Sequence, residues 1–362
     1  MRSNKKDDRL FALGHEHLKM CDIVLSSEKT SISKAICWAT GGSYSHARLY
    51  THNSLIHATP DGVFTENPQR LRFEDKQSVG IFRMKRMLTD EEATRIQAYA
   101  HNQVGKLYSV KDAVSVVLVT QDMLTNRQFC SRLVAQAYRA AGINLVENPD
   151  YCSPQDICTS PLLHEVENTL REPSENEIGV AKKVNPIEIN RRSLYSWLNK
   201  VRLIAKKESF DVGSEQDAHE FVARFPDYSD KICQYVSESG YLENYLQDKI
   251  NNPHRFSVDL CAYMYANNSA LALQQFEHDV KQELSFCIDK LREYQAVNTF
   301  PKSSFSDMMK QLYINLVDFS LLKINTFIAT CNHVGEYKVA AIFDEQYKQI
   351  ILEKQRLQQV QD

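Results

Sequence analysis

The chain has 362 residues, of which 43% are hydrophobic and 25% charged, and this composition excludes collagen-like, disulfide-scaffold and wholly disordered proteins. With 43 basic and 46 acidic residues, the formal net charge is −3. That balance argues against a general nucleic-acid binder, which usually carries a basic excess. The length suits two domains, and the low Gly and Pro counts of 11 and 10 favour long helices.

Targeting and redox signals are few. The first twenty residues lack the apolar core of a signal peptide, and the most apolar run, residues 312–331, is interrupted by Asp318 and Lys323, so no membrane span is predicted. Nine cysteines occur without a CxxC pair, the basic unit of zinc ribbons and redox dithiols. We therefore expect reduced thiols and a cytoplasmic location, although secretion of an effector by a non-classical route would leave no such signal.

Residues 21–83 predict a β-rich segment, because short apolar or alternating runs are separated by Gly, Pro, Asn and Asp. The runs are CDIVLS (21–26), SHARLY (45–50), SLIHA (54–58), GVFTE (62–66) and SVGIFRM (78–84). Residues 88–104 then take helical spacing. Thr89 and Glu92 form a predicted capping box at the start of this helix, and Gly105 is its predicted stop.

A second helix is predicted over FCSRLVAQAYRAAG (129–142), with Gly142 as its end. Cys130 therefore lies at or near a helix N-terminus. Unpaired N–H groups and the helix dipole favour a thiolate there, which would lower the thiol pKa below its usual value of about 8.5. The same N–H groups can hold a developing oxyanion. On position alone, Cys130 could equally be a small buried apolar residue.

Two histidines lie on neighbouring predicted strands, His46 in SHARLY and His57 in SLIHA. A hairpin around residues 51–53 would bring them side by side on one face of the sheet. His46 could then act as a base toward a thiol, with His57 orienting its ring. Either histidine alone also fits an ordinary surface or half-buried strand position. Asp61 and Glu66 are less well placed candidates for the orienting role.

The order DIVLS, TGGSYSHARLY, LIHATPDGV, VGKLYS, FCSRLVAQAY and YCSPQDI resembles the circularly permuted branch of the NlpC/P60 superfamily, the YiiX-like papain-fold cysteine hydrolases. The resemblance covers roughly residues 20–165 and departs from the usual pattern at Cys21, where a Gly is common. It implies that Cys130 is the nucleophile and His46 the general base. It places His57 at the third, orienting position, as in the relatives of lecithin retinol acyltransferase. Tyr108 and Ser131 are implied to line the oxyanion and substrate site.

The function implied is cleavage of an amide bond through a thioester acyl-enzyme, without a metal or organic cofactor, on a peptide-like or acylated small substrate. One alternative is a lipid-directed acyltransferase, thioesterase or phospholipase. In that case DAVSVVLVT (112–120) could line an acyl groove, although it also fits an ordinary buried segment. The other alternative is a catalytically idle binding or scaffolding module.

The expected fold class is α+β: a permuted papain-like domain, with a small antiparallel sheet packed on helices, followed by an all-helical region. We predict a catalytic domain over 1–170, a linker over 171–200, where the sequence turns polar and irregular, and a helical domain over 201–362. Long helices are predicted over 269–296, about 303–332 and about 336–358. The first has an apolar face formed by Leu273, Phe276, Val280, Leu284, Cys287, Leu291 and Tyr294. These helices could pack on one another or offer a surface for a protein partner or self-association.

Overall fold

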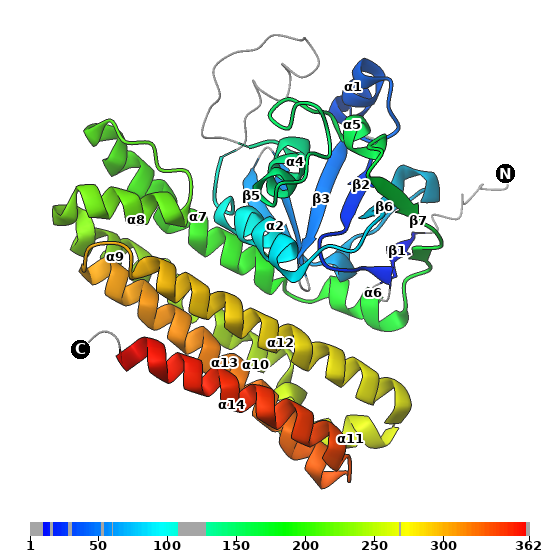
Figure 1. Cartoon of the computed structure of the whole chain (residues 1–362), viewed down its shortest axis with the longest axis vertical. Helices are drawn as coiled ribbons and strands as arrows, with labels where there is room; N and C mark the ends of the chain where they lie inside the picture. The colour runs from blue at the N-terminus through cyan, green and yellow to red at the C-terminus, as the bar shows by residue number, and fades with distance from the viewer. Residues whose placement is uncertain are drawn as a thin grey trace, which may run out of the picture. The chain divides into compact units, whose positions relative to one another are not determined.

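The computed structural model describes residues 10–14, 17–27, 31–51, 54–59, 61–107, 128–267 and 269–359. The chain divides into two compact units, one formed by residues 1–191 with 211–217 and the other by residues 192–210 with 218–362. An α+β arrangement followed by a helical region confirms the predicted fold class. Each unit is described below by itself (Figure 1).

The first unit contains a six-stranded sheet in the order β5-β4-β3-β2-β6-β7, in which every neighbouring pair is antiparallel. Its strands are β2 (Ile23–Ser26), β3 (His46–Thr51), β4 (Ser54–Thr59), β5 (Gly62–Glu66), β6 (Val79–Met84) and β7 (Leu163–Val166). A separate two-stranded sheet pairs β1 (Ala12–Leu13) with β8 (Leu170–Arg171). The five predicted strand runs are therefore confirmed, and β7 joins the sheet as an edge strand that the sequence analysis did not predict.

The described residues of this unit form the helices α1 (Ser31–Thr40), α2 (Asp90–Asn102), α4 (Cys130–Ala140), α5 (Pro154–Cys158) and α6 (Glu175–Lys182), besides the starts of two helices that continue into the second unit. The capping box of α2 forms as predicted, since the Thr89 side chain accepts from the Glu92 N–H and the Glu92 carboxylate accepts from the Thr89 N–H. The β-rich prediction for 21–83 is wrong over residues 31–40, which form α1. The run SISKAICWAT mixes β-branched and helix-forming residues, and ten residues give a weak periodic signal.

The central strands are buried on both faces. Alternation places Ile23, Leu25 and Leu49 on the face where α4 contributes Leu133 and Tyr138 to one core cluster. Figure 1 shows α2 and α4 together on this face of the sheet. A strand covered on both sides reads as an almost continuous apolar run, which is why DIVLS was recognisable in the sequence.

The opposite face of the sheet packs in a second core cluster, in which Val24, Tyr50, Leu55 and Ile81 meet Leu13, Leu71 and Phe73. By the same alternation, His46 and Arg48 belong to this second face with Tyr50, and His57 belongs to it with Leu55. The two predicted catalytic histidines therefore start from the face opposite α4.

The segment expected as a linker, 171–200, contains regular structure. It holds α6 and most of α7 (Pro186–Ala205), which runs from the first unit into the second. Ser174 and Glu177 form a capping box at the start of α6, and Glu177 also pairs with Arg171. Local capping and ion pairing thus order a stretch whose composition is polar. The predicted domain limits themselves stay a prediction.

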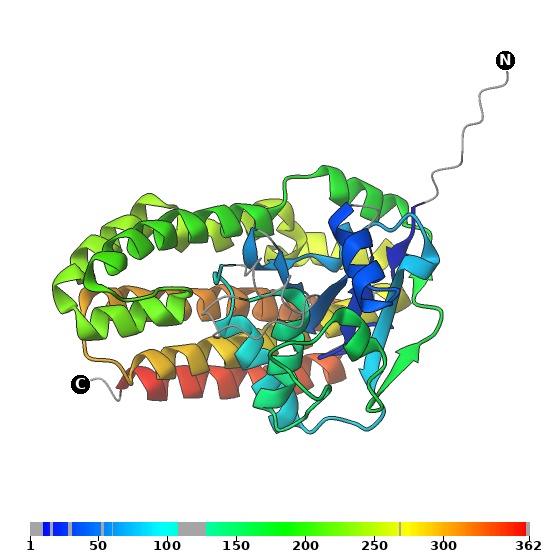
Figure 2. The ribbon, with the colours of Figure 1, turned by 90° about the horizontal axis from the view of Figure 1, so that it is seen from above.

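The second unit is built from helices. After α7 come α8 (Glu215–Arg224), which also begins in the first unit, α9 (Ser229–Glu238), α10 (Gln247–Asn251), α11 (Val258–Asn267), α12 (Ser269–Val297), α13 (Ser304–His333) and α14 (Tyr337–Gln359). The three long predicted helices are confirmed within a few residues, and α13 contacts both α12 and α14 (Figure 2). By length and composition α13 could also cross a membrane, but 56% of its most apolar window is buried, as in the core helix of a bundle.

Most of the predicted apolar face of α12 lies inside this bundle, since Phe276, Val280, Leu284, Cys287, Leu291 and Tyr294 are buried, and Leu273 is half-buried. Ring contacts join Phe276 to Phe327, and Phe319 to Tyr245 and Phe256. For these residues the structure therefore supports packing among the helices, and their burial stabilises the bundle.

The packing of α4 on the sheet should dominate the stability of the first unit. Leu133 is fully buried, so Leu133→Ala removes apolar contacts and leaves a cavity, and we expect a loss of about 2–5 kcal/mol. Hydrogen exchange of peptides from β3 and α4, read by mass spectrometry, measures this free energy of opening. Arg95→Ala on the exposed face of α2 is the control. Equal protection in the two variants would contradict the assigned core.

Candidate active site

The predicted nucleophile begins a helix, as expected. Cys130 is the first residue of α4, and the N-cap residue, Phe129, has no side-chain oxygen to cap the helix. The first backbone N–H groups of α4 are thus not engaged by an N-cap side chain, which costs helix stability and keeps donors available to a ligand.

The sulfur of Cys130 lies against the backbone on both sides of His46. Its Sγ is 4.0 Å from the carbonyl oxygen of Ser45. The backbone N–H groups of Ala47 and Ser131 act on the thiol by favouring its ionised form. These N–H groups and that of Cys130 itself surround the position where charge would develop on sulfur or on an attacked carbonyl oxygen.

Cys130 reaches this backbone because β3 and β4 stop pairing there. Their ladder runs from Thr51↔Ser54 to Leu49↔Ile56, although both strands continue past it, to His46 and Thr59. The N–H of Ala47 lies beyond the paired stretch, and it favours the ionised form of the Cys130 thiol. This opening between β3 and β4 is where a cysteine from one side of the sheet and histidines of the other can meet.

The two histidines do form a pair. His46 Nε2 lies 2.8 Å from His57 Nδ1, with the rings nearly perpendicular at 74°. Continuing the ladder register would set His57 opposite Arg48, so the bond to His46 is diagonal, between residues two positions apart on one face. Across the described ranges, neither histidine ring is hydrogen-bonded to the thiol of Cys130; its partners are backbone groups.

Beyond the histidines lies a group of charged side chains. His57 Nε2 is buried and 3.7 Å from Glu66 Oε2, too far for a hydrogen bond. The same carboxylate accepts from Arg48 Nε at 3.1 Å, and Arg48 Nη1 donates to Ser26 Oγ at 2.6 Å. Glu66 is therefore better placed than its rival Asp61, which pairs with Arg191 instead. Arg48 was missed, although a charge inside a buried strand is a signal of such a role.

Electrostatics oppose the thiolate that the helix position predicted. Desolvation raises the pKa of the Cys130 thiol above its ordinary value, and the N–H groups of Ala47 and Ser131 and the charge of Arg48 offset only part of this. Desolvation also lowers the pKa of His46, and that of His57, well below the ordinary value, and Arg48 acts in the same direction on both. The expected lowered thiol pKa is thus wrong for this state, and the neutral thiol and imidazole are favoured.

The turn before His46 is held in place by α5. The N–H of Ser43 donates to Gln155 Oε1 at 2.9 Å, and a Cβ on Gly42 would come within 2.6 Å of the Gln155 side chain. Only glycine therefore fits this close approach. Ser45 then bonds to the neighbouring strand through its N–H to Ser26 O at 3.0 Å. These contacts fix the backbone just before β3 and hence the position of His46, the first residue of that strand.

The remaining predicted site residues divide. Ser131 lies at the site through its N–H, but its hydroxyl is turned away and donates to Cys152 O at 2.6 Å. Tyr108, and the run 112–120 considered for an acyl groove, lie outside the described residues. Within the described ranges no group of three or more His, Cys, Asp or Glu side chains is arranged to hold a metal ion.

Acid should destabilise the first unit through its histidine pair. Because the folded pKa of His57 lies below its unfolded value of about 6.5, the unfolded chain binds more protons as pH falls below that value. The free energy of unfolding should then fall by up to about 1.4 kcal/mol per pH unit for one histidine. Urea unfolding at pH 5, 6 and 7 measures this slope. His57→Gln should flatten it, and His164→Gln, at an exposed residue of β7, should not.

Part of the first unit is similar to a known protein family. Residues 17–161 match the family described as permuted papain-like amidase enzyme, YaeF/YiiX, C92 family. The crystal structure of the metalloprotein YiiX from Escherichia coli O157:H7 is 22% identical with a TM-score of 0.35, over 41% of this chain and 97% of that chain. No curated protein matches. Residues 17–161 are thus similar to the permuted papain-like amidases, which supports a papain-like cysteine hydrolase fold and chemistry in this part of the chain.

Proposed function

We propose that the first unit is a cysteine amidase in which Cys130 attacks the carbonyl carbon, His46 moves the proton and His57 orients His46. The observation that carries this proposal is the 2.8 Å bond between the two histidine rings at the opening where the sulfur meets the backbone beside His46. A nucleophile, a base and an orienting group at one place is the arrangement that thiol-based acyl transfer needs.

Glu66 decides which ring nitrogen of His46 is free. Its negative charge, 3.7 Å from His57 Nε2, favours the His57 tautomer with its proton on that nitrogen. Nδ1 of His57 then accepts from Nε2–H of His46. Nδ1 of His46 is left without a proton, and it is the atom that takes the proton of the thiol.

The reaction starts from the neutral pair. As Cys130 Sγ bonds to the carbonyl carbon, its proton passes to His46 Nδ1, because the buried site disfavours a preformed thiolate and imidazolium. The N–H groups at the start of α4 and on Ala47 stabilise the oxyanion of the tetrahedral intermediate. His46 returns the proton to the leaving amine, giving a thioester. Water, deprotonated by His46, then hydrolyses the thioester and restores the thiol.

The match to an amidase family favours an amide over a lipid ester as substrate. We expect the acyl group to be peptide-like and the leaving group to be an amine. The following experiment distinguishes amide cleavage from the two alternatives, fatty-acyl transfer and a site without catalytic activity.

Cys130→Ala and His46→Ala should each lower kcat by about a thousandfold or more, because the nucleophile and its base act as one unit. Turnover is measured on a panel of peptidyl aminocoumarin amides and fatty-acyl nitrophenyl esters, and acid-quenched enzyme is weighed for a thioester. Cys158→Ala, at a half-buried thiol of α5, is the control. A fatty-acyl adduct on the enzyme would contradict amide cleavage and indicate a lipid-directed acyltransferase or thioesterase. Turnover that survives Cys130→Ala would refute a cysteine mechanism.

Glu66→Gln should lower kcat about tenfold, with KM little changed, because a neutral amide can present either a donor or an acceptor to His57 and no longer selects one tautomer. Asp61→Asn is the matched control, since Asp61 is an exposed carboxylate on the turn between β4 and β5. The ¹⁵N shifts of the histidine rings read the tautomer directly. An unchanged tautomer and unchanged kcat in Glu66→Gln would remove Glu66 from the mechanism.

A further inference from the structure

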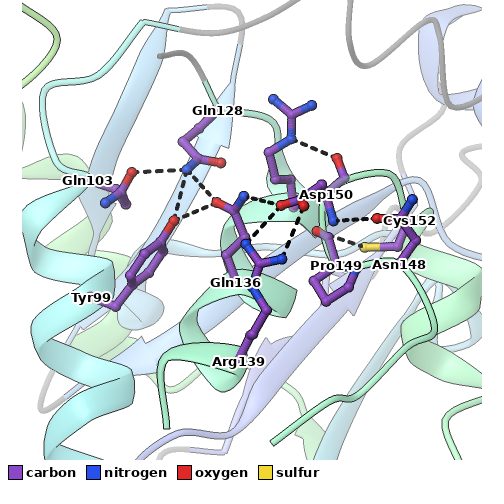
Figure 3. A network of polar contacts seen from close by, with 10 residues as sticks. Tyr99, Gln103, Gln128, Gln136, Arg139, Asn148, Pro149, Asp150 and Cys152 are labelled. Atoms are coloured by element: carbon purple, nitrogen blue, oxygen red, sulfur yellow. Dashed lines mark hydrogen bonds and ion pairs between the residues drawn. The ribbon is translucent and has the colours of Figure 1, made fainter. Parts of the chain in front are cut away.

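A network of amide side chains lies beside the nucleophile's helix (Figure 3). Gln128 Nε2 lies 2.9 Å from Gln136 Oε1 and 2.9 Å from Gln103 Oε1. Gln136 Oε1 also accepts from the Tyr99 hydroxyl at 2.5 Å, and Gln136 Nε2 donates to Asp150 Oδ1 at 2.6 Å. The network joins α2, the approach to α4, α4 itself and the loop that contains Asp150.

Asp150, at the end of the network far from Gln128, fixes which group donates and which accepts in each hydrogen bond of the network. Arg139 donates to both carboxylate oxygens of Asp150, at 2.9 and 3.0 Å. Burial opposes ionisation of Asp150, but its hydrogen bonds from Arg139 and Gln136 outweigh burial, so the pKa of Asp150 lies below its ordinary value. An ionised carboxylate only accepts, so Gln136 must turn its NH₂ toward Asp150 and its oxygen toward Gln128. Gln128 must then present its NH₂ in turn.

This ordered series ends two residues before the nucleophile. Gln128 is buried at 4% exposure, and its backbone N–H donates to Leu107 O at 3.0 Å. On the other side of Cys130, the Ser131 hydroxyl donates to Cys152 O, in the same loop as Asp150. That loop is tied back to α4 by the bond from Arg132 Nε to Asp150 O at 2.8 Å. The chain is therefore held on both sides of Cys130.

We propose that Asp150, acting through Gln136 and Gln128, is a positioning residue that sets where the start of α4 presents Cys130 to the opening between β3 and β4. This inference rests on the proposed function, because it concerns the placement of the same nucleophile. The start of α4 has no N-cap oxygen to hold it, and the bonds of Gln128 to Gln103 and Gln136 anchor the residues that lead into its first turn.

Breaking hydrogen bonds of the network should change the placement and ionisation of the Cys130 thiol more than it changes the stability of the fold. The N–H groups of Ala47 and Ser131 favour the thiolate, and this effect weakens as their distance from Sγ grows. A displacement of about 1 Å in the first turn of α4 changes these distances and misaligns attack, and misplacements of that size can cost about a hundredfold in rate.

The test uses the full chain and two variants of the network. Gln136→Met keeps the length of the side chain and removes its hydrogen bonds, and Asp150→Asn keeps its shape and removes the fixed direction. Ser160→Ala is the matched control, because it deletes a buried hydrogen bond of this unit that lies outside the network, from the Ser160 hydroxyl to Leu145 O at 2.6 Å. Alkylation of Cys130 by iodoacetamide is followed across pH by peptide mass spectrometry, and kcat and KM are measured on the amide found for the wild type.

For both network variants we expect the alkylation profile of Cys130 to move to higher pH and kcat to fall about tenfold or more, with KM within about twofold. Ser160→Ala should lower the melting temperature without either change. An unmoved profile and kcat in Gln136→Met and Asp150→Asn, or equal changes in Ser160→Ala, would overturn the positioning role. The alkylation profile needs no turnover, so it tests this role even if Cys130→Ala shows that the proposed amidase function is wrong.

Discussion

The candidate site of the first unit depends on the place where β3 and β4 stop pairing. While the two strands are paired, the sheet separates the face covered by α4 from the face that holds His46 and His57. Beyond Leu49 the two strands are no longer paired, and the Ala47 N–H favours the ionised form of the Cys130 thiol. The rings of His46 and His57 are hydrogen-bonded to each other at this place. A ladder continued by two more residues would use the Ala47 N–H for strand pairing and remove it from the thiol.

Several groups around this opening lower the stability of the fold. The first turn of α4 starts from a phenylalanine that cannot cap it, and two histidines and an arginine occupy positions that a core strand would give to apolar residues. Each loss is offset locally: the amide network supports the approach to α4, and Glu66 and Ser26 bind Arg48. Buried polar groups that are satisfied in this way hold one arrangement of the site rather than several.

Much of this could be predicted from residues alone. The strand runs, the capping box at Thr89, the start of a helix at Cys130 and the buried face of α12 follow from alternation, capping chemistry and helical spacing, which are local properties. The pairing of His46 with His57 followed from a short hairpin. Where local signals were short or polar the prediction was wrong or incomplete: α1 lay within a stretch expected to be β-rich, β7 was missed, and the expected linker contains α6 and most of α7.

The sequence by itself thus determined the element types and brought forward a cysteine and two histidines, because spacing and residue chemistry are written along the chain. Only the tertiary structure decided which protonation states the site favours, because these depend on how deeply the rings and the sulfur are buried and on the nearby charge of Arg48. It also decided that Glu66 rather than Asp61 faces His57, and that Gln128, Gln136 and Asp150 meet. Desolvation and contacts between distant residues come from the folded arrangement of the whole unit, so no local pattern reports them.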